Sequence, residues 1–408
     1  MVPGPEGNAA DRGASGKLDA IVVGAGAIGL ACAWRAAQAG FRVRVLERDE
    51  PGAGASGVAA GMLAPVGEAT WGEELLLQAA LASHAAWPAF VAELAEASDA
   101  ETGFIAGGAI HVALDPDEAA ELRRRFDLMR SHDLAAEWLG GGECRALEPG
   151  LATSVFGGVL APHEYGVDPG ALVRALVSAC SRAGVDVRSR AEVTDAIVDN
   201  GRLAGVITAD GTRHEADHTI LAAGAWSSGL DWLPAEARPP VRPVKGQILT
   251  LHGPAEHPVA TRIVVTERVY LVPRADGRLI AGATVEETGF DTRVTAGGVH
   301  ELLREAYRAL PEVAELELER AIAGLRPGTP DNAPLVGQGA LPGLILATGH
   351  YRNGILLAPL TAAGVLAALQ GSELPPALAV ADPARFHNRG RDFGAYTEQT
   401  PTGSAGIA

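Results

Sequence analysis

Two arginines lie in segments with little other charge, and this placement points to anion recognition. Arg326 occurs in "AGLRPGT" and Arg352 in "GHYRNGI". Because a guanidinium keeps its proton even when buried, each is expected to face an anion. A carboxylate could accept two parallel hydrogen bonds from the fork of Arg326. The alternative, an arginine tied only to backbone carbonyls, stays open for both residues.

A glycine turn near the amino terminus indicates a dinucleotide site. The stretch "LDAIVVGAGAIGLACAWRAAQAGFRVRVLERD" predicts a strand at 20–23, a turn, a helix to residue 39 and a strand at 42–46. The glycines of GxGxxG would allow the turn, the approach of a pyrophosphate and the packing of helix on strand. An acid after the second strand could accept from a ribose hydroxyl. An ordinary glycine turn in an α/β sheet is the alternative. The residues of this predicted site are Gly24, Gly26, Ala27, Ile28, Gly29 and Glu47.

The segment after that acid favours FAD over NAD. "RDEPGAGASGVAAGMLAP" is rich in small residues, so it could run close beneath a large flat ligand. Arg48 and Ser56 are its candidates for facing the phosphates. Its other predicted contacts with the cofactor are Ala60, Gly61 and Met62.

The stretch "HEADH", residues 214–218, matches the pattern of a helical zinc site. That pattern needs a helix, in which residues four apart share one face. Here it follows an Asp-Gly turn and precedes a β-rich run, so the two imidazoles would lie about 13 Å apart in an extended chain. No metal is expected at this position.

Further local patterns outline the elements that must position these residues. Asn200-Gly201 and Asp210-Gly211 predict three antiparallel strands between 193 and 224, and Asp276-Gly277 predicts another hairpin. The stretch "GVDPGALVRALVSACSRAGVDV" predicts a helix followed by a strand. Another helix is expected to begin near Ile355 and to direct its amino-terminal amides at the edge of a bound ring.

Length and charge limit the possible functions. With 408 residues the chain is long enough for two domains, and its net charge of −17 disfavours nucleic acid and anionic membranes as partners. The uncharged run at 355–369 is shorter than the roughly 20 residues of a membrane span. Three widely spaced cysteines suit free thiols in a reducing compartment, so a cytoplasmic protein is expected.

Seven ordered motifs resemble the D-amino-acid oxidase superfamily of FAD enzymes, and most closely its glycine oxidase (ThiO) branch. They are "VVGAGAIGL", "AAGML", "LAAGAWS", "PVKGQ", "YLVPRADGRLIAGAT", "AGLRPGTPD" and "GHYRNGILLAP". The resemblance implies an α/β fold: a Rossmann-like FAD-binding domain of the glutathione-reductase type, interleaved with an α+β substrate domain built on an antiparallel sheet. The expected segments are 17–95, 146–232 and 322–390 for the FAD-binding domain and 96–145 and 233–321 for the substrate-binding domain, with a disordered leader at 1–16 and a flexible tail at 391–408.

The resemblance also implies roles for individual residues. It assigns the substrate carboxylate to Arg326, places Tyr270 over the substrate and sets Arg352 on the substrate side. No cysteine follows Cys180, so the FAD is expected to be noncovalent, unlike that of the related sarcosine oxidases. Further contacts with FAD are expected from Val193, Ala223, Gly224, Trp226, His350, Arg352, Asn353, Gly354, Ile355 and Leu356.

The implied reaction is oxidation of a small amino acid by O2 to a 2-oxo acid and hydrogen peroxide, in thiamine thiazole synthesis. Glycine is the expected substrate, with sarcosine or small D-amino acids beside it. Two alternatives stay open: an oxidase of D-amino acids or N-substituted glycines in another pathway, and an FAD-dependent dehydrogenase with another acceptor. Arg268 stands where glycine oxidases have a histidine, which bears on the size and charge of the pocket. A homo-oligomer is expected.

Overall fold

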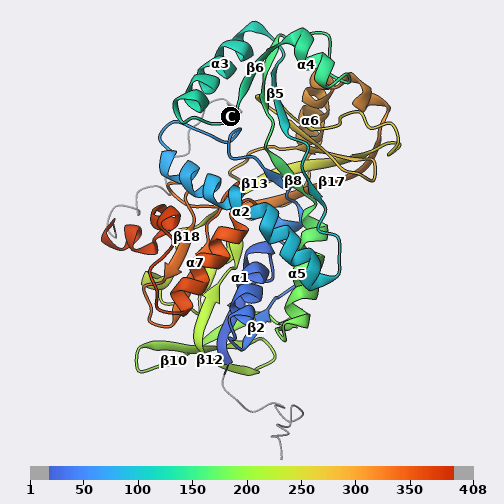
Figure 1. Ribbon diagram of the computed structural model, residues 1–408. Coiled ribbons are helices and arrows are strands. Elements are labelled where there is room, and N and C mark those ends of the chain that lie inside the picture. Colours follow the sequence, from blue (N-terminus) through green and yellow to red (C-terminus); the bar gives the residue numbers. More distant parts are fainter. Residues whose placement is uncertain (1–17, 390–408) are drawn as a thin grey trace, which may run out of the picture.

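The computed structural model describes residues 18–389, in which two sheet-based domains lie one above the other (Figure 1). The expected leader at 1–16 and tail at 391–408 lie outside these residues. A largely parallel sheet covered by helices forms one domain, and a mainly antiparallel sheet forms the other. This mixed α/β architecture confirms the fold class expected from the sequence.

The lower domain in Figure 1 is built on an eight-stranded sheet. Its central strands are parallel, in the order β9, β2, β1, β12 and β19. The hairpin β10–β11 extends from the first half of β12, and β18 pairs antiparallel with β19. The strands are β1 (Leu18–Val23), β2 (Val43–Leu46), β9 (Asp186–Arg188), β10 (Val193–Asp199), β11 (Arg202–Thr208), β12 (Arg213–Leu221), β18 (Leu335–Gln338) and β19 (Leu344–Thr348).

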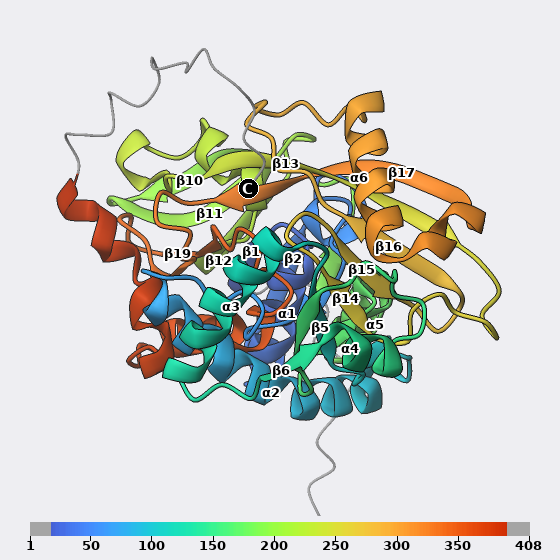
Figure 2. The ribbon, with the colours of Figure 1, turned by 90° about the horizontal axis from the view of Figure 1, so that it is seen from above.

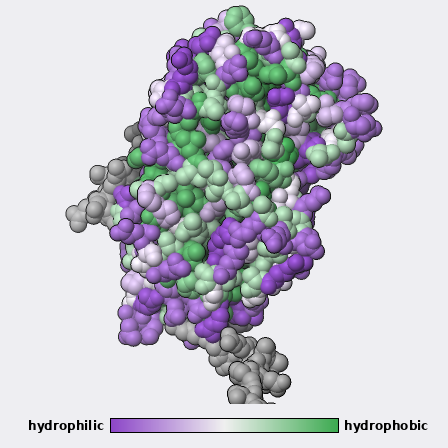
Figure 3. Space-filling model, in the orientation of Figure 1, coloured by the Kyte–Doolittle hydropathy of each residue, from purple (hydrophilic) through white to green (hydrophobic). Residues whose placement is uncertain are grey.

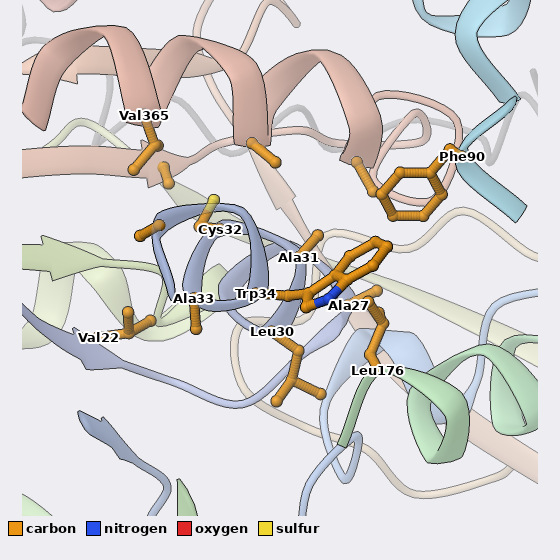
Figure 4. Close-up of a cluster of buried hydrophobic side chains, with 14 of the residues drawn as sticks. Val22, Ala27, Leu30, Ala31, Cys32, Ala33, Trp34, Phe90, Leu176 and Val365 are labelled. Carbon is orange, nitrogen blue, oxygen red and sulfur yellow. The ribbon is translucent and has the colours of Figure 1, made fainter. Parts of the chain in front are cut away.

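Four helices build the main core of this domain. Helices α1, α5 and α7 pack against the sheet, and α2 lies across α5 and α7. Figure 4 shows the ring of Trp34 between Phe90 and Leu176, and the Trp34 and Phe90 rings meet edge to face at 5.5 Å between centroids. The helices are α1 (Ala27–Gln38), α2 (Glu74–Ser98), α5 (Pro169–Arg182) and α7 (Ala358–Leu369).

Helix α2 is the one helix of residues 18–389 that is long and apolar enough to cross a membrane. Core packing accounts for much of its apolar character, because 44% of its most apolar window is buried. Trp87 Nε1 and Ser83 Oγ both donate to the Leu356 carbonyl, at 2.8 and 2.7 Å. Figure 3 shows hydrophobic residues toward the middle of this face of the molecule and hydrophilic residues toward its margins. Helix α2 therefore serves the core and holds the turn that precedes α7.

The upper domain contains a second eight-stranded sheet, in the order β17, β13, β16, β15, β14, β5, β7 and β6. Its neighbouring strands are antiparallel, apart from β14 and β5. Figure 2 shows α6 beside β16, where it covers this sheet. The strands are β5 (Ala109–Ala113), β6 (Glu137–Gly140), β7 (Gly157–Ala161), β13 (Arg242–His252), β14 (Ile263–Val265), β15 (Tyr270–Pro273), β16 (Arg278–Gly282) and β17 (Glu317–Gly328). The helices are α3 (Pro116–Ser131), α4 (Gly141–Leu147) and α6 (Ala296–Ala309). A small third sheet joins β3 (Met62–Leu63), β8 (Tyr165–Val167) and β4 (Phe104–Ile105).

Three expected boundaries differ from the structure. Residues 146–161 are expected in the FAD-binding domain, but β7 pairs with β5 and β6 of the upper sheet. Strand β17 runs without interruption across the expected boundary at 322, because its pairing with β13 continues to Gly328. Helix α7 begins at Ala358 and not near Ile355, because residues 351–357 form turns. Each difference reflects contacts between residues far apart in the chain, which local patterns do not contain.

The local predictions elsewhere are confirmed. The meander forms β10, β11 and β12, and the hairpin at Asp276-Gly277 joins β15 to β16. The helix-strand segment forms α5 and β9. The residues of HEADH lie in β12, as an extended chain, and His214 Nδ1 contacts Arg44 Nη1 at 2.9 Å. The three cysteines are buried free thiols.

Asp168 connects the two domains at the start of α5. Its Oδ1 accepts from the Ala171 amide at 2.9 Å, as a helix N-cap, and its Oδ2 accepts from Arg278 of β16 at 2.7 Å. Burial alone would raise the pKa of Asp168, but the Ala171 amide and the Arg278 guanidinium outweigh it and hold the pKa below its usual value. The ionised carboxylate therefore stabilises the fold.

Replacing Asp168 with Asn should lower the free energy of unfolding at neutral pH by about 1–3 kcal/mol, because a charged hydrogen-bond acceptor is lost. Since the folded-state pKa is depressed, this stabilisation is present above the unfolded-state pKa of about 4 and is lost as the pH falls through the folded-state value. Denaturant unfolding at neutral pH and near pH ~3 should show the difference between the two proteins narrowing in acid. Asp276→Asn, at the exposed second partner of Arg278, is the control and should change little. A difference that stays constant with pH would contradict the electrostatic role.

Candidate active site

A cavity of about 320 Å³ lies between the two domains, at the carboxyl ends of β1 and β2. Its volume is within the range of small-molecule sites, roughly 300–1,000 Å³. The position of the cavity also favours a ligand site, since open α/β sheets bind ligands beyond the carboxyl ends of their strands. Every residue expected to contact FAD or substrate lines this cavity, except Gly29. The structure thus brings together positions that are more than 300 residues apart in the chain.

The glycine turn forms one wall. Gly24 has φ of +106°, and a Cβ there would lie 2.5 Å from the Ala222 carbonyl oxygen, so the neighbouring strand leaves no space for a side chain. Gly29 lies away from the cavity, in α1, where a Cβ would lie 3.2 Å from the Ala222 Cβ. Its part is therefore to let the helix approach the sheet. Ser56 Oγ accepts from the Ala27 amide at 3.0 Å and so caps α1 from another segment.

Glu47 follows β2 and is held by two backbone amides. Its Oε2 accepts from Ala25 at 2.7 Å, and its Oε1 accepts from Asp49 at 2.9 Å. These bonds fix the carboxylate at the edge of the cavity. Each oxygen keeps a further lone pair, so a ribose hydroxyl could still donate to it.

An arginine and two aromatic rings join the domains beside this edge. The guanidinium of Arg48 lies 4.2 Å from the centre of the Trp226 ring, and both residues line the cavity. Trp226 in turn stacks on Phe290, which follows the upper sheet, at 6.1 Å between centroids. Arg48 is paired with Asp49 and lies over the indole, so it is positioned by these contacts.

Backbone amides form the opposite wall. In the described chain, the amides of Gly354, Ile355 and Leu356 donate to no protein acceptor, and all three residues line the cavity. They precede the first turn of α7, so free donors and the helix amino terminus point to an anionic ligand edge. His350 has another part: its Nε2 contacts Thr361 Oγ1 of α7 at 2.9 Å, and burial lowers its pKa to about 3. The imidazole is therefore neutral.

Arg326 and Tyr270 meet at the upper end of the cavity. Arg326 Nη1 donates to the carbonyls of Lys245 and Thr284, at 3.3 and 3.1 Å, while within residues 18–389 no carboxylate forms an ion pair with it. Burial raises the pKa of Tyr270, and the nearby Arg326 opposes this only in part, so the phenol stays protonated. One side of the guanidinium is thus fixed by the backbone and the rest can bind an anion.

Two strand glycines make room for these side chains, and sequence reasoning did not assign them. A Cβ at Gly246 of β13 would lie 2.6 Å from Arg326 Cζ, and a Cβ at Gly282 of β16 would lie 2.6 Å from Tyr270 Cζ. Gly is unfavourable inside a strand and often marks close approach of another group. In the sequence, the signal for this close approach was a glycine inside each strand, in "PVKGQ" for Gly246 and in "LIAGAT" for Gly282.

Arg352 has a carboxylate partner that the sequence did not indicate. Its Nε lies 3.2 Å from Glu68 Oε2, and both residues line the cavity. The Glu68 carboxylate raises the pKa of Arg352 above its usual value. Glu68 lies in the loop between β3 and α2. The sequence signal that could have identified it was an acidic residue at the end of a long segment of small residues.

Arg268, in contrast, does not reach the cavity. It is exposed in the turn between β14 and β15, where its amide donates to Thr266 Oγ1 at 3.1 Å. The concern that it changes the size and charge of the pocket is therefore not supported.

The lining fits FAD. Gly24 and Gly26 line the cavity without side chains, and the Glu47 carboxylate and the free amides of Gly354 and Ile355 line the same space. Donors at one end and an acceptor at the other suit an anionic ring edge and a ribose. The cavity is also largely lined by small and apolar residues, as a flat aromatic cofactor requires.

Comparison with known proteins agrees with this lining. A family model described as "FAD dependent oxidoreductase" (DAO) matches residues 19–369. The chain belongs to this FAD-dependent oxidoreductase family. FAD is therefore its cofactor.

Individual members of the family provide closer comparisons. The chain is 34% identical to the glycine oxidase of Geobacillus kaustophilus over 347 residues, 85% of this chain and 91% of the relative. The crystal structure of glycine oxidase from the same organism superimposes with a TM-score of 0.84 and covers 91% of this chain and 99% of that one. The bifunctional protein ThiO/ThiG of Trichormus variabilis is 36% identical over 347 residues, 85% of this chain, and the chain spans about half the length of that relative, 51%.

Substituting Glu47 by Gln should weaken FAD binding by about 1–3 kcal/mol, the scale of a lost charged hydrogen bond. The Gln side chain ends in one oxygen and one NH2 group. The NH2 group cannot accept a hydrogen bond from a backbone amide or from a ribose hydroxyl, so at least one of the bonds that Glu47 accepts is lost. Fluorescence quenching of FAD by the apoprotein measures the affinity. Glu50→Gln, at an exposed carboxylate that does not line the cavity, is the control. An unchanged affinity in the Glu47 variant would remove the ribose assignment.

FAD should leave the protein on denaturation by heat or acid, because no cysteine follows Cys180 and all three cysteines, Cys32, Cys144 and Cys180, are buried away from the cavity lining. The purified protein should be yellow, and the supernatant of the denatured sample should carry the flavin absorbance. Flavin that sediments with the precipitated chain would contradict noncovalent binding.

Proposed function

We propose that this protein oxidises glycine, and other small amino acids of similar size, with FAD and O2. The observation that carries the proposal is Arg326, a guanidinium at the cavity wall that is held by two carbonyls and has no carboxylate partner in the described chain. A substrate carboxylate would complete it with a bidentate pair. Similarity to glycine oxidases supports the choice of substrate class.

Tyr270 and Arg326 would hold the same carboxylate. The protonated phenol can donate one hydrogen bond, and the guanidinium can donate two. Because both side chains are fixed by strands of one sheet, β15 and β17, their relative position does not depend on a mobile loop. Binding would then orient the α-carbon, which is the main contribution an enzyme makes when a cofactor does the chemistry.

The net reaction of glycine, O2 and water gives glyoxylate, ammonia and hydrogen peroxide. The chemistry that FAD supplies when bound is acceptance of a hydride from the substrate carbon and reoxidation by O2. The protein must also favour the neutral amine, because an ammonium does not release hydride. Arg326, which has no carboxylate partner in the described chain, disfavours a further positive charge near it, and this lowers the pKa of a bound amine.

The free amides before α7 have a matching part. The amides of Gly354, Ile355 and Leu356 would hold the pyrimidine edge of bound FAD. Because these donors are already oriented, they would stabilise negative charge there without reorganisation. The neutral His350 leaves the positive potential there to the backbone and the α7 dipole.

Biological context follows the same proposal. A cytoplasmic homo-oligomer that supplies thiamine thiazole synthesis is proposed, since the relatives include bifunctional ThiO/ThiG proteins. The alternatives, an oxidase of D-amino acids or N-substituted glycines and a dehydrogenase with another acceptor, use the same arginine and tyrosine.

A peroxide assay over glycine, sarcosine, D-alanine and D-proline tests the function. Glycine should have the highest kcat/KM, and peroxide should form in proportion to O2 consumed. Reduction of a dye or quinone without peroxide would favour the dehydrogenase. Peroxide from D-proline or D-alanine at a far higher kcat/KM would favour the second oxidase.

Replacing Arg326 with Ala should raise KM for glycine steeply, by about 2–5 kcal/mol in binding, because one partner of a poorly solvated charge pair is removed. Arg326→Lys should recover only part of the loss, since an ammonium cannot form the bidentate pair. Steady-state kinetics measure both, and the bound-FAD spectrum should stay near that of the parent.

An amine without a carboxylate is the matched control for this pair of variants. Its slow oxidation should change little when Arg326 is replaced, because it makes no use of the guanidinium. If the Ala variant oxidised glycine as well as the parent does, Arg326 would have only a structural part in the β13–β17 pair.

A further inference from the structure

The ion pair between Glu68 and Arg352 divides the two guanidinium groups of the cavity into one free and one neutralised. We propose that Glu68 determines substrate class: by occupying Arg352 it restricts the site to amines with a single carboxylate and excludes amines that carry two. This inference rests on the proposed function and names the residue that limits its substrates. Glu68 is then a specificity-determining residue.

The two arginines differ in what surrounds them. Arg326 is met by two backbone carbonyls, which leave its charge uncompensated, whereas Arg352 Nε lies 3.2 Å from the Glu68 carboxylate. Both line the cavity. A monocarboxylate needs one free guanidinium and finds it in Arg326. A second carboxylate near Arg352 would have to displace Glu68 or lie beside its negative charge, and like charges that close are strongly disfavoured.

Glu68 acts at the substrate end of the cavity. Glu68 and Tyr270 both line the cavity, and the charge of Glu68, after the larger effect of burial, contributes to raising the pKa of Tyr270. The Glu68 and Arg352 side chains are 29% and 42% exposed, so this is a polar wall open to a ligand and not a sealed ion pair. A ligand can therefore compete for either partner.

The loop that carries Glu68 is held from the upper domain. The amide of the preceding residue, Gly67, donates to Glu164 Oε1 at 2.6 Å, and Arg125 of α3 donates to the Gly67 carbonyl. A Cβ at Gly67 would lie 2.5 Å from His111 Nε2, so a side chain has no room there. Glu164 and His111 are themselves buried, at 1% and 3% exposed. The position of Glu68 is thus built into the domain junction.

Glu68→Gln tests the proposal, because it keeps the shape of the side chain and removes its charge. The substrates are glycine, sarcosine and iminodiacetate, of which the last is a secondary amine with two carboxylates. In the variant, kcat/KM for iminodiacetate relative to glycine should rise by roughly tenfold or more, since Arg352 becomes free to bind a second carboxylate. For glycine and sarcosine the change should be smaller, and their ratio should be preserved.

Glu73→Gln is the matched control. Glu73 is another carboxylate at the end of the same loop, it accepts from Asn332 Nδ2 at 2.9 Å, and it does not line the cavity. Its charge also reaches Arg352, though less than that of Glu68. The control therefore removes one negative charge near Arg352 without breaking the ion pair, and the iminodiacetate preference should stay as in the parent.

A binding measurement gives a second readout that does not require turnover. Acetate and malonate are titrated into the holoenzyme and followed by the change in flavin absorbance. The parent should bind malonate no more tightly than acetate. The Glu68→Gln protein should bind malonate roughly tenfold more tightly than the parent does, with acetate affinity nearly unchanged.

The outcomes separate this inference from the proposed function. If the parent oxidises none of the amines, the proposed function fails, and the acetate and malonate titrations still decide the role of Glu68. If the parent oxidises glycine but the variant keeps the parental preference in both assays, the inference is overturned and the function stands. A parent that already prefers iminodiacetate or malonate would also overturn it. Loss of all substrates together in the variant, with the malonate ratio unchanged, would show that Glu68 only positions the loop.

Discussion

The positive charge of Arg326 is the constraint on which the upper half of the cavity depends. A guanidinium cannot lose its proton, so the fold must surround it with acceptors or leave a place for an anion. The β13–β17 pair supplies two carbonyls, and Gly246 leaves space for the planar group. Nothing in the described chain neutralises the remaining charge. In the proposed function, an anionic substrate would complete an arrangement that the sheet has already formed.

The cavity exists only because two domains meet around it. The glycine turn, Glu47 and the amides before α7 belong to the lower domain, whereas Arg326 and Tyr270 come from strands of the upper sheet. Contacts across the junction therefore have a functional meaning. Asp168 bonds to Arg278, and Glu164 holds the loop of Glu68 from above. Any change in the angle between the domains would move the substrate groups relative to the cofactor groups.

Much of the lower half could be predicted, because its information is local. A strand, a glycine turn, a helix and an acid within about 30 residues form one unit whose parts contact each other, and periodicity and turn chemistry are sufficient to find it. The meander and the Asp276-Gly277 hairpin were predicted for the same reason. The place of β7 in the upper sheet was not predicted, because its hydrogen bonds go to the distant strand β5 and to β6. The start of α7 was predicted three residues too early.

By itself the sequence indicated the types of chemical group and the local shapes that carry them: a dinucleotide turn, a carboxylate that could accept from a ribose hydroxyl, and two arginines that need anions. Resemblance to a family extended this to FAD, an amino-acid substrate and a tyrosine over that substrate. Only the tertiary structure decided which charges meet. It left Arg326 free and paired Arg352 with Glu68, and it turned Arg268 to the surface. The physical reason is that local propensity acts over a few residues, whereas an ion pair depends on the distance between side chains that lie 284 positions apart, a distance that only the packed fold determines.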